Sequence, residues 1–349
     1  MTSLVRKAIV QLIGHLTVIH LEEHRREKLM KFGMQLPQAG SMFSRLIDPV
    51  EAYETMTRAA QLADECGYET IWLGDHFRLQ TLHPGERDED LWFECWTTTA
   101  ALARDTKRVR IGQTVTCNGY RNPALLAKMA STVDVLSHGR LNFGIGAGWD
   151  EQEYRAYGYE YPDAPERLRM LREAVQVILA MWTQEEAEFL GKYYQIRGAI
   201  NQPKGVQKPH IPLLIGGSGE KVTLKLVAQY GDACDVSGDL AQLRRKFAVL
   251  KAHCEAVGRD YEQIHRVASA ICVMGETDEE AKANMPEEWK AQFGRSADAV
   301  ESGALIGSPK TIRSRIAANE AVGVQELRLA FPNALDLEAI RRFAKEFIA

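Results

Sequence analysis

Asp75 and His76 are adjacent residues whose side chains could together transfer protons. They follow the run Thr70–Leu73, which has the composition of a short buried strand. A carboxylate beside an imidazole can keep the pKa of the imidazole near neutrality, which suits general acid–base catalysis. A structural alternative stays open, in which Asp75 caps the following loop and His76 packs on Trp92 or Trp96.

A second candidate for chemistry is a glycine-rich segment that could bind phosphate. It lies between an apolar run and a helical stretch and consists of Gly216, Gly217, Ser218, Gly219, Glu220 and Lys221. Backbone N–H groups at a strand-to-helix turn can surround a phosphate, and Lys221 adds positive charge. One helix terminus contributes only about 0.3–1 kcal/mol, so several N–H groups would have to act together. A plain glycine turn is the alternative, but barrels commonly hold phosphate in late strand-to-helix loops.

The loop 113–123 carries polar side chains that could grip a heteroaromatic ring. Thr114, Thr116, Cys117 and Asn118 can all form hydrogen bonds. From the residues alone, a structural loop with a turn at Asn118 and a helix starting at Pro123 is favoured.

The run 144–148 superficially imitates a dinucleotide-binding fingerprint. Its spacing is Gly-x-Gly-x-Gly, which lacks the full G-x-G-x-x-G pattern, and it lies in the middle of the chain. We therefore expect these glycines to let the backbone pass close under a flat ring, with Trp149 as a wall or lid.

These loops are separated by a regular alternation of apolar runs and helical stretches. Predicted strands cover 31–36, 70–73, 109–113, 140–145, 212–215, 233–236, 266–273 and 326–330, and the helices between them include 49–66, 93–104, 123–136 and 165–182. Strand–helix alternation requires a parallel sheet, and eight such units close naturally into a barrel. We predict an α/β fold, a (β/α)8 TIM barrel, with the active site at the carboxyl ends of the strands.

Two regions depart from this alternation. Residues 1–29 carry apolar positions at helical spacing, and we expect an N-terminal extension that packs as an amphipathic helix. The segment 185–210 has turn signals at Gly191, Gly198 and Gly205 and is predicted to be an insertion. Residues 30–349 are then expected to form one barrel domain.

Composition excludes several classes of partner. The 349 residues carry a formal net charge of −4, with both signs mixed along the chain, so no nucleic-acid-binding face is expected. The charged residues that follow the first apolar run argue against a signal peptide, and that run is too short to span a membrane. The six cysteines are far apart and form no C-x-x-C pair, so we expect no metal, and free thiols in the cytoplasm.

Several motifs in this order resemble the luciferase-like monooxygenase superfamily, and specifically its F420-dependent oxidoreductase branch. They are Trp72-Leu-Gly-Asp-His-Phe77, Tyr120-Arg-Asn-Pro123, Ser137-His-Gly-Arg-Leu-Asn-Phe-Gly-Ile-Gly-Ala-Gly-Trp149, Glu153, Tyr157-Gly-Tyr159, Glu166-Arg167, Gly191-Lys-Tyr-Tyr194 and Ile215-Gly-Gly-Ser-Gly-Glu-Lys221. The resemblance extends from about residue 30 to 331. It implies a luciferase-like barrel, usually a homodimer, that binds an isoalloxazine-like ring at the strand ends.

The resemblance also implies roles for individual residues. His76 and Asp75 would line the reactive face of the ring, and the family's non-proline cis peptide would fall at Thr114–Val115. The remaining expected cofactor contacts are Cys117, Gly148, Trp149 and Gln152 near the ring or its ribityl chain, and Gly216 to Lys221 near the phosphate. The expected substrate pocket contains Gln35, Phe77, Trp92 and Trp96.

The sequence thus predicts an F420-dependent oxidoreductase that transfers hydride to or from a small organic substrate. Two alternatives remain: an FMN-dependent monooxygenase on the same fold, and a protein that binds F420 or flavin without catalysis. A phosphosugar barrel enzyme is disfavoured, because no cluster of Lys, Asp or Glu occupies successive strand ends. The substrate itself is not specified by any motif.

Overall fold

Eight parallel strands close into a barrel in the computed structural model, which describes residues 30–38, 48–78, 91–286, 303–332 and 337–348. The barrel strands are β1 (Lys31–Gln35), β2 (Thr70–Leu73), β3 (Arg110–Gln113), β5 (Leu141–Gly146), β8 (Leu213–Gly216), β9 (Ala233–Asp235), β10 (His265–Met274) and β12 (Glu326–Ala330). Each pairs with its neighbour in parallel, and β12 pairs with β1, so the ring is complete. The predicted (β/α)8 barrel is confirmed.

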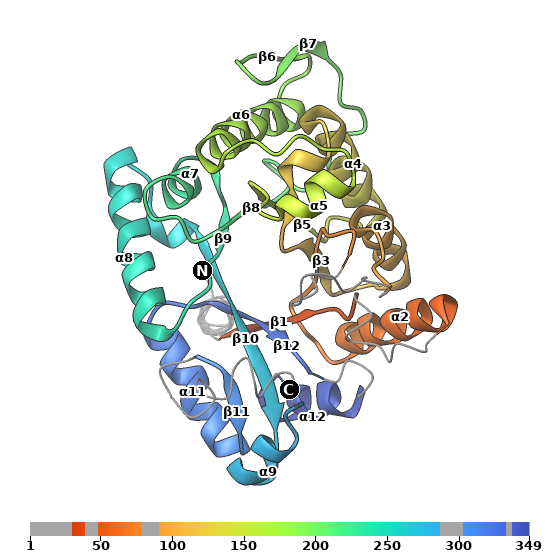
Figure 1. The fold of residues 1–349 in the computed structure, drawn as a ribbon, viewed down its shortest axis with the longest axis vertical. Helices are drawn as coiled ribbons and strands as arrows, with labels where there is room; N and C mark the ends of the chain where they lie inside the picture. Colours follow the sequence, from red (N-terminus) through yellow and green to blue (C-terminus); the bar gives the residue numbers. More distant parts are fainter. Residues whose placement is uncertain (1–29, 39–47, 79–90, 287–302, 333–336, 349) are drawn as a thin grey trace, which may run out of the picture.

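Helices surround the strands (Figure 1). They are α2 (Pro49–Glu65), α3 (Cys95–Asp105), α4 (Pro123–Leu136), α5 (Glu151–Ala156), α6 (Ala164–Thr183), α7 (Thr223–Tyr230), α8 (Leu240–Val257), α9 (Asp278–Ala283), α11 (Pro309–Ala321) and α12 (Leu337–Phe347), with short 3-10 turns η2 (Asn118–Tyr120) and η3 (Tyr261–Gln263).

The helix starts follow from local chemistry. Asp48 accepts hydrogen bonds from the backbone amides of Val50 and Glu51, and Pro49 occupies the first turn of α2. Asn122 and Pro123 repeat this arrangement at α4. A side-chain acceptor satisfies amides that have no partner within the helix, and proline has no amide to satisfy.

The centre of the barrel is filled by one large side chain, Trp72. It is 1% exposed and packs with Leu214, Ala233 and Val267. A Cβ atom on Gly33 would lie 2.6 Å from the Trp72 indole nitrogen, and one on Gly112 would lie 2.6 Å from the same ring. The two glycines therefore make the space that the tryptophan fills.

The predicted insertion contains an antiparallel hairpin. β6 (Ala187–Leu190) pairs with β7 (Gln195–Ala199) within the expected segment 185–210. The hairpin lies beyond α6 at the upper edge of Figure 1, outside the ring of barrel strands.

Besides the two hairpin strands, two further short strands were not predicted. β4 (Thr116–Cys117) pairs with the end of β5, and β11 (Leu305–Gly307) pairs with the far end of β10. Runs of two and three residues give no readable alternation, so their pairing depends on the longer strand beside them.

Residues 1–29, where the N-terminal helix is expected, lie outside the described residues. None of the helices in the described ranges combines the length and the apolar composition that crossing a membrane would need.

Candidate active site at the carboxyl ends of the strands

A cavity of about 270 Å³ opens at the carboxyl ends of β2, β3, β5 and β8. Its lining includes many of the residues that the sequence predicts: Asp75, His76, Thr114, Val115, Cys117, Gly148, Trp149, Gly216 and Gly217. The same cavity is also lined by Tyr120, Gly146, Ala147, Asp150, Leu168, Leu171 and Thr223. Loops far apart in the sequence thus meet at the end of the barrel where the site is expected.

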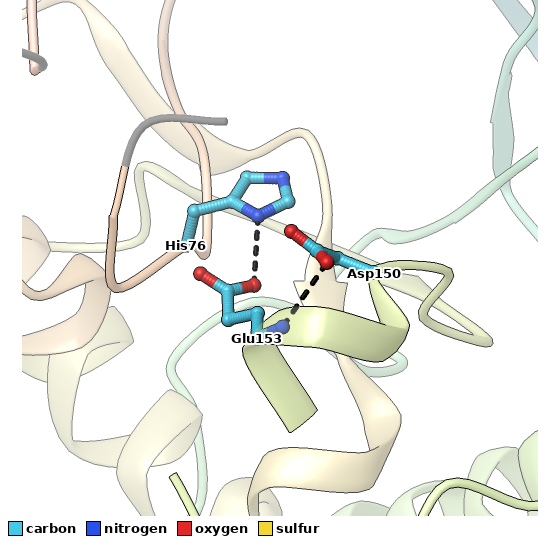
Figure 2. Close-up of side chains that lie close together, drawn as sticks. All are labelled: His76, Asp150 and Glu153. Atoms are coloured by element: carbon cyan, nitrogen blue, oxygen red, sulfur yellow. Dashed lines mark hydrogen bonds and ion pairs between the residues drawn. The ribbon is translucent and has the colours of Figure 1, made fainter. Parts of the chain in front are cut away.

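His76 is held by Glu153, a residue of the short helix α5. The imidazole Nδ1 lies 2.9 Å from Glu153 Oε2, and Figure 2 shows the Glu153 carboxylate pointing at that nitrogen. The same carboxylate oxygen accepts the hydroxyl of Tyr120, and Oε1 accepts the backbone amides of Phe77 and Arg78. The Glu153 side chain is 0% exposed, so these bonds replace the water that it lacks.

The pair shifts the acid–base behaviour of both groups. Burial alone would lower the pKa of His76, but the hydrogen bond and charge of Glu153, with the charges of Asp75 and Asp150, raise it above its ordinary value. Burial alone would raise the pKa of Glu153, yet the hydrogen bonds from His76, Tyr120 and the Phe77 amide lower it. Glu153 is therefore an anion and favours a charged imidazole.

Asp75 does not pair with His76, which corrects the acid–base pair expected from the sequence. Its carboxylate accepts two hydrogen bonds from Arg121, at 2.6 and 3.0 Å, one from the Cys117 amide at 2.9 Å and one from the Thr116 hydroxyl at 3.1 Å. These four donors fix the carboxylate against the loop after β3. Asp75 therefore organises the wall of the cavity, although its own side chain is fully buried.

The backbone around Val115 fits the flat ring that the resemblance implies. The Thr114–Val115 peptide bond is cis, as expected. A Cβ atom on Gly146 or on Gly216 would lie 2.6 Å from a Val115 methyl group, so both glycines are needed for Val115 to occupy the cavity floor. The two glycines and the aliphatic side chain of Val115 form an apolar surface on which an aromatic ring can lie.

Trp149, Cys117 and Gly148 all line the cavity. Trp149 is 59% exposed, and its ring lies edge-on to His76 with centroids 5.8 Å apart, as a wall beside the imidazole. The Cys117 Sγ lies 2.9 Å from the Tyr154 hydroxyl, and burial raises the pKa of Cys117 to about 12, so it is a neutral thiol. Gly148 has φ of +76°, and a Cβ there would collide with both Tyr154 and Cys117.

The glycine-rich loop after β8 is open, but not every amide in it is free. The Gly217 amide donates to the Asp235 carbonyl at 3.3 Å, which removes it from the expected phosphate contacts. Gly219 and Lys221 are exposed, and α7 begins beside them without a side-chain cap. The Ser218 hydroxyl lies against Ser237. The loop can therefore receive an anion through Ser218, Gly219 and the first turn of α7.

Six other predicted contacts are also absent from the cavity lining: Gln35, Phe77, Trp92, Trp96, Gln152 and Glu220. Glu220 faces α8, with its carboxylate 2.7 Å from Arg245, and Gln152 accepts a hydrogen bond from Arg78. Phe77 packs on Tyr120. Trp96 is 2% exposed and donates to Thr116, so it belongs to the core and not to the substrate pocket.

Trp92 is a second indole ring that lies next to His76. Its ring is edge-on to the imidazole, with centroids 5.6 Å apart. The Trp92 indole nitrogen is buried and has no hydrogen-bond partner within the described ranges. His76 thus makes edge-on contacts with two indole rings, those of Trp92 and Trp149.

Gln35 belongs to a polar network inside the mouth of the barrel. It accepts hydrogen bonds from Thr114 at 3.2 Å and from Arg328 at 2.8 Å, and Arg328 also reaches Asp235 at 3.1 Å. The Arg328 Nε is buried and has no partner among the residues described. Ser269, opposite Arg328 in the middle of β10, is exposed, so open space adjoins this network.

His76, Asp150 and Glu153 each have an atom that could coordinate a metal ion, an imidazole nitrogen or a carboxylate oxygen. These three atoms lie within 4.8 Å of one another (Figure 2). The Glu153 oxygen nearest the imidazole already accepts two hydrogen bonds, and Asp150 accepts the Glu153 amide at 3.1 Å. The three side chains are therefore joined in one hydrogen-bonded network.

Sequence reasoning missed the roles of Glu153, Arg121 and Arg328. The spacing of Asp150 and Glu153 is typical of a helix cap, and Asp150 does cap α5. That pattern does not predict the contact between Glu153 and His76, which lies 77 positions earlier. Arg328 carried a usable signal, because a charge inside an apolar strand next to β1 must face the interior or a partner.

Comparison with known proteins places these observations in a family. The model described as "Luciferase-like monooxygenase" matches residues 30–326. An F420-dependent glucose-6-phosphate dehydrogenase of Amycolatopsis mediterranei is 34% identical over 171 residues, which cover 49% of this chain and 49% of that relative. An FMNH(2)-dependent dimethylsulfone monooxygenase of Pseudomonas putida is 24% identical, over 78% of this chain and 82% of the relative.

Among solved structures, an F420-dependent secondary alcohol dehydrogenase matches with a TM-score of 0.72 at 21% identity, over 91% of this chain and 98% of that chain. This likeness concerns the fold. Since the family model matches residues 30–326, which are most of the sequence, the chain belongs to the luciferase-like monooxygenase family.

Proposed function

We propose that this chain is an F420-dependent oxidoreductase that transfers hydride between the deazaflavin and a small organic substrate. One observation carries the proposal: His76 and the Val115 floor line the same cavity at the strand ends. The relative that is 34% identical over about half of this chain is named F420-dependent, which favours a deazaflavin over FMN.

The residues of the cavity fit such a cofactor. The floor at Val115 would lie against the ring, with Trp149 beside it, and Ser218, Gly219 and the first turn of α7 would receive the phosphate. When bound, a deazaflavin supplies hydride transfer, whereas FMN can also activate oxygen. The chain itself orients the ring, excludes water with indole side chains and holds a proton at His76.

Side-by-side titration of purified protein with F420 and with FMN, followed by their fluorescence, tests this proposal. We expect saturable F420 binding and weaker FMN binding. Gly216→Val should abolish F420 binding, because its side chain would occupy the space of Val115. Gly158→Asn is the control, since a Cβ there meets nothing within 4 Å and asparagine tolerates the φ of +77° at this position.

The other outcomes separate the alternatives. Tighter FMN binding with oxygen consumption would establish the monooxygenase instead. Tight F420 binding without turnover of any substrate would identify a non-catalytic binding protein. Failure to bind either molecule would contradict the proposal.

The polar network at Arg328 is our candidate for the substrate side of the site. Its buried Nε–H has no partner among the described residues, and a substrate carbonyl or carboxylate oxygen could accept from it. Arg328→Met should then raise the KM for substrate and leave the Kd for F420 unchanged. An equal loss of F420 affinity would assign Arg328 to the cofactor instead.

Homodimer formation and a cytoplasmic location remain predictions. The six cysteines are free thiols, which supports a reducing compartment. Analytical ultracentrifugation of the purified chain would test the dimer, and a monomer at micromolar concentration would contradict it.

A further inference from the structure

Glu153 occupies a buried position beneath His76 and joins three parts of the chain. Its Oε2 contacts the imidazole and the Tyr120 hydroxyl, and its Oε1 accepts the amides of Phe77 and Arg78. A buried carboxylate is costly unless it is fully hydrogen-bonded. These four contacts therefore keep Glu153 ionised and hold the loop after β2 in place.

The contacts also decide which nitrogen of His76 faces the cavity. Tyr120 and the two amides are donors, so the Glu153 carboxylate is an acceptor throughout, and Nδ1 of His76 must carry a hydrogen. Figure 2 shows the second ring nitrogen on the far side of the imidazole from Glu153. His76 lines the cavity and is 29% exposed, so Nε2 is the atom available to a substrate.

The charges that face His76 are mainly negative. Glu153 and Asp150 approach from α5 and Asp75 from the loop after β2, while Trp92 and Trp149 contribute uncharged ring edges. Of the neighbouring cations, Arg121 is engaged by Asp75 and Glu94, and the Arg78 guanidinium donates to Gln152. The charged imidazole is favoured, and the pKa of His76 is raised accordingly, despite burial that would lower it.

We propose that Glu153, supported by Tyr120, is a positioning residue that presents His76 to the cavity as a proton donor, so that the chain works as a reductase. This inference rests on the proposed function. In that direction the carbon of a substrate C=O or C=N group would receive the hydride that a bound, reduced deazaflavin would supply. The Nε2 proton of His76 goes to the oxygen or nitrogen as the double bond becomes single, and the neutral imidazole regains a proton from solvent. The substrate thus gains a hydride and a proton, which together are two electrons and two protons, and the cofactor is oxidised by two electrons.

Nitrogen-15 NMR of the histidines in the cofactor-free protein tests the role of Glu153 directly. We expect His76 to carry hydrogen on Nδ1 when neutral and to titrate above 6.5. Glu153→Gln should lower that midpoint by about 1–3 pH units, the range for loss of an adjacent opposite charge. Glu151→Gln is the matched control, because Glu151 lies on the same helix and pairs only with exposed Arg155.

Tyr120→Phe provides a second variant in case Glu153→Gln fails to fold. Without the Tyr120 hydroxyl, the Glu153 carboxylate has one donor fewer and interacts more strongly with the charged imidazole. The titration midpoint of His76 should therefore rise, whereas Glu153→Gln should lower it. A merely structural role would not give shifts of opposite sign. An unshifted midpoint in both variants, or a neutral His76 with its hydrogen on Nε2, would overturn the inference.

The pH dependence of catalysis gives the last test. With reduced F420 and a carbonyl or imine substrate, kcat/KM should fall as pH rises through the His76 midpoint, and Glu153→Gln should move this fall to lower pH by the same shift. Activity that rises through that midpoint would contradict the reductive direction. Failure to bind F420 would contradict the proposed function but not the role of Glu153, because the histidine titration needs no cofactor.

Discussion

His76 shows how one side chain acquires its chemistry from residues distant in the sequence. The adjacent carboxylate, Asp75, is bound by Arg121, while the partner of the imidazole is Glu153, 77 positions later. Adjacency along the chain predicted the wrong partner, because consecutive residues after a strand point in different directions. The position of His76 at a strand end was nevertheless readable from the sequence.

Replacement of His76 tests its role at this scale. His76→Ala should reduce turnover by about 10²–10⁴-fold, the usual contribution of a general acid or base. Because the floor at Val115 and the phosphate loop are unaffected, the Kd for F420 should change little. Turnover is measured as the change in F420 absorbance with any substrate that the unmodified chain accepts, and unchanged turnover would remove His76 from the mechanism.

The Asp75–Arg121 pair is predicted to be a stability determinant. The Arg121 side chain is 11% exposed and that of Asp75 is fully buried, so Arg121→Met would leave a buried charge without its partner. Such losses destabilise proteins by about 3–5 kcal/mol. Urea unfolding of Arg121→Met should show a correspondingly lower midpoint.

Arg155→Met is the control for that measurement. Arg155 also pairs with a carboxylate, Glu151, but both side chains are more than half exposed. An exposed pair of this kind contributes at most about 0.5 kcal/mol. Equal unfolding midpoints for the two variants would show that the buried pair is not important for stability.

At the scale of elements, the strands are fixed by what fills the space between them. Trp72 enters the barrel from β2, and its indole nitrogen donates to Glu326 on β12 at 3.0 Å. Gly33 on β1 lies against the Trp72 indole and the Glu326 carboxylate. A Cβ atom added at Gly33 would lie 2.5 Å from a Glu326 oxygen. The strand lengths were predictable from apolar runs, but the fit of one tryptophan against glycines on other strands was not.

This fit predicts a specific coupling between β1 and β2. Gly33→Ala should destabilise the protein by about 1–3 kcal/mol, the usual cost of overpacking. Trp72→Phe removes the indole nitrogen nearest the new methyl group, so the double variant should lose less than the sum of the single losses. Denaturant unfolding of the three variants measures this coupling, and strict additivity would contradict it.

Element boundaries also show where sequence patterns stop. The helices that begin with a capping side chain and proline, α2 and α4, start where predicted. β4 and β11 were missed because two or three residues carry no periodicity. The glycine-rich loop 216–221 was located from its composition, but the hydrogen bond of the Gly217 amide depends on β9 and could not be predicted from that loop.

At the scale of the molecule, the closed barrel explains why residues from β2, β3, β5 and β8 share one cavity. All strands run in parallel, so each strand-to-helix loop opens at the same end. The alternation of elements was enough to predict this arrangement and the end at which the site lies. It could not show that Trp96 is core, since that depends on how α3 packs on Phe143 and the loop after β3.

The crystal structure of the protein with F420 bound is the most direct test of the account. It should show the ring on the Val115 floor beside Trp149, with His76 Nε2 facing it and the phosphate at Ser218, Gly219 and the start of α7. Density for F420 anywhere else, or a ring separated from His76 by the Trp92 and Trp149 side chains, would contradict the assignment of this cavity.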